Sequence, residues 1–106
     1  MRVGEPRTMM EYRLTNEADE DVVESYLYGL RNFGGIQAER YATSLDRCFD
    51  LIATFPEMAR ERPEFNPPVR IHHHERHYII YRIELDHVLI IRVLRGEMDL
   101  ASHLNE

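Results

Sequence analysis

The chain has 106 residues, enough for one domain with a small hydrophobic core. Hydrophobic residues make up 43% of it and charged residues 30%, as in ordinary soluble domains, and no apolar run reaches the roughly 20 residues that a membrane helix needs. The formal net charge is −6, which argues against a general nucleic-acid binder, because such proteins need a basic surplus to neutralise phosphates. We therefore expect neither membrane association nor direct sequence-specific nucleic-acid binding, and the single cysteine, Cys48, fits a cytoplasmic protein.

The chain is expected to begin with a flexible leader. Residues 1–9 lack periodicity and contain Gly4 and Pro6, so we predict a leader there and a single domain over residues 10–106. Polar and apolar residues alternate along Glu11–Thr15, which predicts a short first strand of that domain.

Two helices are expected next. Apolar residues recur at spacings of three and four, which predicts helices over about Asn16–Asn32 and Ile36–Thr54. Gly34-Gly35 separates them and Pro56 ends the second. Such a short link predicts an antiparallel helical hairpin.

The apolar stretch Tyr78–Leu94, broken at Asp86-His87, predicts a β-hairpin against which the rest of the chain packs. A three-residue loop, Leu85–His87, gives one wholly apolar face, because side chains along a strand alternate with period two. The pairs expected on that face are Ile83 with Leu89, Tyr81 with Ile91 and Ile79 with Val93.

One further strand completes the predicted sheet. Pro56–Pro68 contains four prolines and is expected to be a loop, and Val69–His73 is the next strand. A three-residue turn at His74–Arg76 then places Ile71 beside Ile79, and Met98–Leu104 is expected to form a last half-turn. The element order is β-α-α-β-β-β, an α+β sandwich with the helical hairpin on one face of a four-stranded, mostly antiparallel sheet.

The second face of this sheet is expected to have no cover from the chain. Apolar residues lie there between arginines, and an exposed apolar patch edged by charge usually marks a partner site. The arginines would anchor an acidic partner, because arginine forms bidentate pairs with carboxylates. Without a partner, the same face would support a homodimer. The candidate partner-binding residues are Arg70, Ile80, Arg82, Val88, Ile90, Arg92 and Leu94.

Several short segments between Tyr12 and Leu104 form a pattern in their order and spacing. They are Tyr12-Arg13-Leu14-Thr15, the helix start Ala18…Asp21, Ala38, Phe55-Pro56, Val69-Arg70, Tyr78–Arg82, and Ile90–Leu94 followed by Asp99 and Leu104. In these segments the chain resembles the ParE/RelE superfamily of bacterial toxins, and within it the ParE (plasmid-stabilisation) branch. The resemblance implies a RelE/ParE-like fold and a type II toxin that a ParD-like antitoxin neutralises and that blocks replication through DNA gyrase. Arg95 departs from the family pattern, which commonly has a histidine there.

The RelE branch implies an alternative, a ribosome-dependent endoribonuclease that cuts messenger RNA. Metal-independent cleavage needs a base, an acid and cations on the phosphate. The residues available for these roles are His72, Tyr78, Arg70, Arg82 and Arg92. The acidic net charge favours a protein target over RNA, so we predict a gyrase-binding toxin without catalytic residues and keep the ribonuclease as the alternative.

A cluster of histidines raises the question of a metal site. His72, His74 and His77 lie close in sequence, but no cysteine accompanies them and Glu75 is the nearest carboxylate. Zinc usually takes three or four protein ligands. We therefore predict a histidine-rich turn without a metal ion or other cofactor.

Overall fold

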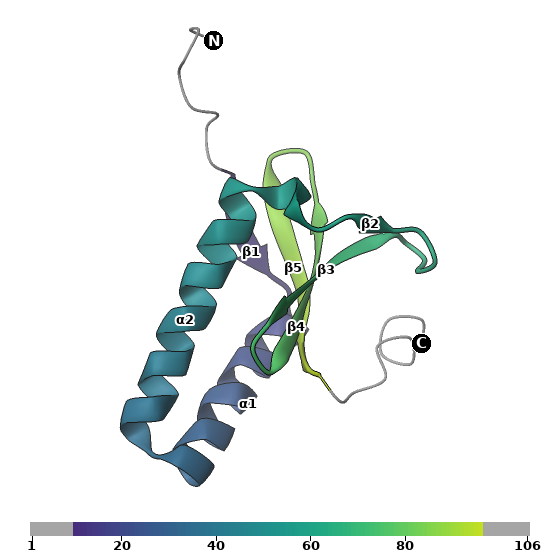
Figure 1. The fold of residues 1–106 in the computed structure, drawn as a ribbon. Coiled ribbons are helices and arrows are strands. Elements are labelled where there is room, and N and C mark those ends of the chain that lie inside the picture. Colours follow the sequence, from purple (N-terminus) through teal and green to yellow (C-terminus); the bar gives the residue numbers. More distant parts are fainter. Residues whose placement is uncertain (1–9, 97–106) are drawn as a thin grey trace, which may run out of the picture.

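The structure, a computed structural model, describes residues 10–96 and shows a helical hairpin beside a twisted sheet (Figure 1). The helices are α1 (Asn16–Phe33) and α2 (Gly35–Thr54), and a short 3-10 helix follows at Pro56–Met58. The strands are β1 (Glu11–Leu14), β2 (Glu61–Arg62), β3 (Val69–His74), β4 (His77–Ile83) and β5 (His87–Arg95). The predicted leader and the predicted half-turn at Met98–Leu104 lie outside the described residues.

Capping residues set the ends of the two helices. The Thr15 hydroxyl accepts a hydrogen bond from the backbone N–H of Ala18 at 3.0 Å, and acidic residues follow in the first turn of α1. Between the helices, Gly34 has a φ of 86°, a left-handed conformation that suits glycine. Each helix boundary lies within one residue of the predicted one, and the predicted hairpin is confirmed.

The strands form one sheet in the order β1-β5-β4-β3-β2, in which β1 is parallel to β5 and the other neighbours are antiparallel. The predicted α+β class is confirmed, with the two-residue strand β2 added where a loop was expected. Thr15 fixes the start of α1 to β5. Its N–H donates to the Ile90 carbonyl oxygen at 3.0 Å, and its hydroxyl donates to that of Ile91 at 2.7 Å.

A β-bulge changes the predicted register between β4 and β5. Ile79 pairs with Val93 as expected, but beyond the irregularity at Ile80/Tyr81 the partner of Tyr81 is Ile90 instead of Ile91. The pairing of Ile83 with Leu89 is likewise wrong, because Ile83 pairs with Val88. An extra residue in β5 reverses the alternation of side chains, so Val88 and Ile90 face the helices.

The turn between β3 and β4 is one residue shorter than predicted. His74 pairs with His77, which leaves Glu75 and Arg76 as a two-residue turn, and Glu75 has a φ of 51°. Ile71 therefore pairs with Ile80, and the expected pair with Ile79 is wrong. The shift puts every side chain of β3 on the face opposite to the predicted one.

Two hydrophobic clusters cover the two faces of the sheet. The larger one joins α2 to the sheet and contains Leu45, Cys48, Phe49, Ile52, Ile79, Tyr81, Val88, Ile90 and Val93. The smaller one lies on the outer face, where Phe65 and Val69 pack on Ile80 and Leu94. Phe65 belongs to the segment between β2 and β3. The predicted uncovered face is therefore wrong at this end of the sheet.

The helical hairpin extends beyond the sheet at its joined end (Figure 1). Ala18, near the start of α1, is fully buried, whereas Leu27 and Leu30 in its second half are 40% and 38% exposed. The apolar face predicted for α1 therefore contributes to the core near its start and remains accessible further along.

Candidate partner-binding surfaces

The four apolar residues predicted to form an exposed partner site are buried. Ile80, Val88 and Ile90 have no exposed surface, and Leu94 is 1% exposed. Ile80 and Leu94 lie in the cluster with Phe65, and the bulge turns Val88 and Ile90 towards the helices. The predicted exposed patch is wrong, and the homodimer expected on it loses its basis.

Arg92 is held by a carboxylate of the same chain. Its Nε and Nη2 donate to the two carboxylate oxygens of Asp21 at 2.8 and 3.0 Å, a bidentate pair between β5 and α1. Asp21 also accepts a hydrogen bond from the backbone N–H of Val93 at 2.9 Å. The acidic group that Arg92 was predicted to bind in a partner is thus supplied by α1.

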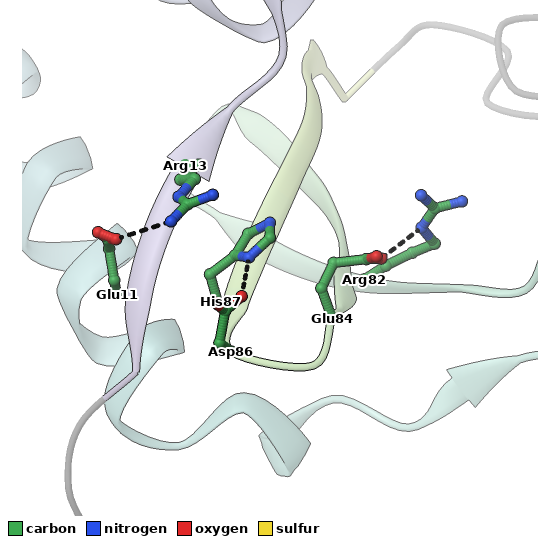
Figure 2. Close-up of polar contacts among 6 residues, drawn as sticks. All are labelled: Glu11, Arg13, Arg82, Glu84, Asp86 and His87. Atoms are coloured by element: carbon green, nitrogen blue, oxygen red, sulfur yellow. Dashed lines mark hydrogen bonds and ion pairs between the residues drawn. The ribbon is translucent and has the colours of Figure 1, made fainter.

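Arg70 and Arg82 do not form a row with Arg92. Arg70 pairs with Tyr81 on the helix side of the sheet, and its Nη1 donates to the Ala59 carbonyl oxygen at 2.6 Å. Arg82 lies elsewhere, and its Nε donates to Glu84 at 3.2 Å (Figure 2). The three arginines point to three different places, so a shared role in binding one partner stays a prediction without geometric support.

The charged side chains around the β4–β5 loop pair among themselves (Figure 2). The pairs are Arg13 with Glu11 at 3.3 Å, Arg82 with Glu84 at 3.2 Å and His87 with Asp86 at 2.7 Å. The hydrogen bond from His87 lowers the pKa of Asp86. Such surface pairs contribute little to stability, and Arg13 and Arg82 each already have a carboxylate partner, which weakens their attraction for an acidic partner.

The residues considered for ribonuclease chemistry are split between the two faces of the sheet. His72 pairs with Ile79 on the helix side, where burial lowers the pKa of its imidazole. Tyr78 is on the other face, and its ring stacks on that of His73 with centroids 4.7 Å apart. With Arg92 bound to Asp21, this arrangement does not bring together a base, an acid and phosphate-binding cations.

Hydrogen bonds to His74 and His77 link α2 to the β3–β4 turn. The Tyr41 hydroxyl hydrogen-bonds His77, and the Ser44 hydroxyl lies 3.0 Å from Nε2 of His74. Burial lowers the pKa of His77 to about 4 and raises the pKa of Tyr41 to about 12, so both are neutral at pH 7. The Ser44 hydroxyl also donates a hydrogen bond to the Tyr41 carbonyl oxygen within α2, at 2.9 Å. The network is suited to joining the helix to the turn.

Between residues 10 and 96, the structure shows neither a metal-binding cluster nor an activated thiol. No group of three or more His, Cys, Asp or Glu residues in that range is placed to hold a metal ion. Burial raises the pKa of the Cys48 thiol to about 11, which keeps it protonated. Of the helices that the structure describes, none is long and apolar enough to cross a membrane.

A cleft of about 490 Å³ opens where α1, α2, the β3–β4 turn and the end of β5 meet. Both helices line it, and they come close together at Gly29, where an added Cβ would lie 3.3 Å from the Ala38 side chain. The residues that give the cleft its apolar and aromatic character include Tyr26, Tyr28, Phe33, Ala42, Leu45 and Val93.

Arginines surround this cleft. Two of them are held by aromatic rings. The Arg76 guanidinium lies 4.6 Å from the centre of the Phe33 ring, and that of Arg95 lies 4.2 Å from the centre of the Tyr28 ring. The arginines lining the cleft are Arg31, Arg40, Arg76 and Arg95, and the carboxylates are Asp21, Glu24 and Glu75. Since Asp21 is bound to Arg92, the surroundings are locally basic in a chain of net charge −6.

Sequence reasoning missed this cleft. Its arginines are spread from residue 31 to residue 95, and the apolar residues of α1 were assigned to the core because their spacing is that of an ordinary amphipathic helix. The glycine within α1, Gly29, was the available signal, since a glycine inside a helix often marks a close approach of another element.

Comparison with solved structures shows the fold. The chain is similar to the chromosomal ParDE TA system from P. aeruginosa, with a TM-score of 0.73 and 21% identity, covering 84% of this chain and 98% of that one. The match agrees with the observed helical hairpin and sheet.

Comparison with protein sequences shows the family. A family model described as the ParE toxin of the type II toxin-antitoxin system parDE matches residues 12–100. Toxin ParE1 of Caulobacter vibrioides is 31% identical over 96 residues, which cover 91% of this chain and 99% of that protein. Toxin ParE of Escherichia coli is 28% identical over 97 residues, covering 91% of this chain and 94% of that protein.

The chain therefore belongs to the ParE toxin family. It is the toxin component of a type II toxin–antitoxin system, and its partner is an antitoxin.

Proposed function

We propose that this toxin acts on DNA gyrase in the cytoplasm, blocks replication, and does so by binding instead of cleaving a bond. The main support is the absence of an assembled acid–base set: His72 and Tyr78 lie on opposite faces, and Arg92 is bound to Asp21 within residues 10–96. The acidic net charge agrees with a protein target, because phosphate binding favours basic proteins.

The alternative, RNA cleavage on the ribosome, has weaker support. A ribonuclease would need its base, its acid and its cations within reach of one phosphodiester. Arg70 and Arg82 point to different sides of the sheet, and the outer charges near Arg82 are balanced by neighbouring carboxylates.

Two assays with the purified toxin separate these functions. We expect the toxin to inhibit DNA supercoiling by gyrase and to leave translation of a reporter message in a cell-free system unchanged. In cells, induction should cause filamentation and a DNA-damage response while protein synthesis continues. Intact supercoiling together with cleaved messages would overturn the proposal. Co-expression of the antitoxin should restore growth in either case.

A further inference from the structure

We propose that the groove between α2 and the free edge of β3 is where this toxin holds its target, and that its occupant is an extended, acidic segment of DNA gyrase. This inference rests on the proposed function and adds to it the surface of the toxin and the chemistry of the segment bound there. The α2–β3 groove has a volume of about 560 Å³, and its lining includes Arg40, Ser44, Arg47, Leu51, His72 and His74.

The edge of β3 has room for another strand. β2 pairs with Val69 and Arg70 only, and within residues 10–96 no strand lies beside Ile71–His74 on that side. The backbone N–H and C=O groups of such an edge pair with an extended segment of another chain through main-chain hydrogen bonds. An open edge of this length therefore fits a short extended segment.

Charges are sorted between the two flanks of α2. Arg40 and Arg47 are seven residues apart, which is close to two helical turns, and both line the groove beside β3. Asp46 and Asp50 lie on the flank towards β1, where burial and their negative charges raise the pKa of Tyr12. The groove is therefore locally basic, although α2 as a whole has more carboxylates than arginines.

The two groove arginines are available to a carboxylate of another chain. Both are exposed, and neither forms an ion pair with any residue between 10 and 96. Of the described residues that line the groove, Glu39 is the one carboxylate, and it accepts a hydrogen bond from the Tyr26 hydroxyl of α1 at 3.2 Å. Because arginine forms bidentate pairs with carboxylates, an acidic segment complements the groove and a basic one is repelled.

The spacing along α2 suits an extended occupant. Seven residues of helix place Arg40 and Arg47 about 10 Å apart along the axis. Carboxylates on one face of a strand repeat every roughly 7 Å, a difference that long arginine side chains can span. Leu51 continues the same stripe of α2 and is 45% exposed, so an apolar side chain of the segment can pack on it.

A charge reversal tests the basic groove. Arg47→Glu should raise the dissociation constant for purified gyrase holoenzyme about tenfold or more at roughly 150 mM salt, because an attraction becomes a repulsion. The toxin concentration that halves supercoiling should rise equally. The matched control is Arg31→Glu, which makes the same change in net charge at an exposed arginine outside the groove and should change both values less than about twofold. Equal effects of the two variants would overturn the proposal.

A gain-of-function variant gives a result that misfolding cannot produce. Thr43 is exposed, lies between the two arginines and lines the groove, so Thr43→Arg adds a third positive charge there. We expect the dissociation constant for gyrase to fall about threefold, since the added arginine attracts the same acidic segment. An unchanged or weaker affinity would contradict the groove as the binding surface.

Amide hydrogen exchange of the toxin with and without gyrase tests strand addition. Bound gyrase should slow exchange at Ile71–His74 by about tenfold or more, because the free edge gains hydrogen bonds. The matched control is β1, the strand at the opposite end of the sheet, whose amides should exchange as before. Protection at β1 instead of β3, or at neither, would overturn the docking of an extended segment on β3.

The same measurements separate this inference from the proposed function. A wild-type toxin that neither binds nor inhibits gyrase overturns both. If the wild type inhibits gyrase and Arg47→Glu behaves like Arg31→Glu, only the groove fails. If Arg47→Glu weakens binding to gyrase loaded with DNA and leaves binding to DNA-free gyrase unchanged, the groove contacts phosphates, and the acidic segment is ruled out.

Discussion

The two ends of the helical hairpin have similar apolar patterns and different surroundings. Near the sheet, Phe49 and Ile52 of α2 are 2% and 0% exposed. At the joined end, Leu27, Phe33 and Ile36 are 40%, 48% and 74% exposed. Periodicity tells which side of a helix is apolar, but the extent of the sheet decides how much of that side is covered by the same chain. The uncovered end is therefore where we expect a partner to supply the missing contacts.

Among single substitutions, we expect the largest loss of stability at the end of the hairpin that packs on the sheet. Phe49→Ala should lower the free energy of unfolding by about 3–5 kcal/mol, because it leaves a cavity between α2 and the sheet. Leu51→Ala, on the same helix but 45% exposed, is the matched control and should cost less than about 1 kcal/mol. Urea denaturation measures both. Similar losses for the two variants would contradict the distinction between the buried and exposed sides of α2.

We expect a smaller change in folding stability, which depends on pH, from His77 at the border between the two ends of the hairpin. The pKa of His77 falls from 6.5 to about 4 on folding because its imidazole is buried, so the unfolded chain binds the extra proton more readily. The contribution of neutral His77 to folding stability is fully present above pH 6.5 and is lost as the pH falls towards 4, by about 3 kcal/mol in total.

The measurement is the free energy of unfolding as a function of pH for the wild type and for His77→Gln. The variant should lose the part of the slope between pH 6.5 and 4 that belongs to His77, while the contribution of the carboxylates remains. Parallel curves for the two proteins would show that His77 does not cause the acid sensitivity.

We expect the smallest change in stability at the joined, exposed end of the hairpin. Leu30→Gln should change the stability of the isolated toxin by less than about 0.5 kcal/mol, because its side chain is 38% exposed and has little packing to lose. A loss of stability above about 1.5 kcal/mol would show that this end is packed in the isolated protein, and the comparison between the two ends would fail.

Local signals in the sequence were sufficient to predict both helices, most of the strands and the α+β fold class. Thr15 as a cap, glycine after α1 and Pro56 after α2 each act on the backbone directly beside them, so the helix boundaries could be predicted to within one residue. The bulge in β5 could not be predicted, since an extra residue in one strand is favoured by packing on both faces of the sheet and leaves no local mark. Phe65 was missed for a similar reason, as a single aromatic residue in a proline-rich loop.

The candidate site was harder to predict than the fold. The predicted arginines were chosen for their alternation in strands, and a turn one residue shorter than expected was enough to send Arg70 to the helix side. The arginines around the cleft come from two helices, a turn and the end of a strand, so their proximity depends on the whole tertiary arrangement.

The pairing of β1 with β5 has a consequence for synthesis of the chain. Thr15 and Ile91, joined by a hydrogen bond, are 76 residues apart in sequence, and β5 is the last strand of the sheet to be made. The sheet cannot close around its central strands before β5 has left the ribosome, and contacts this distant slow the folding of small domains. The helical hairpin forms from neighbouring residues and is available earlier. Mature toxin therefore arises after translation of the strands is finished, which gives an antitoxin already present in the cell time to meet it as it folds.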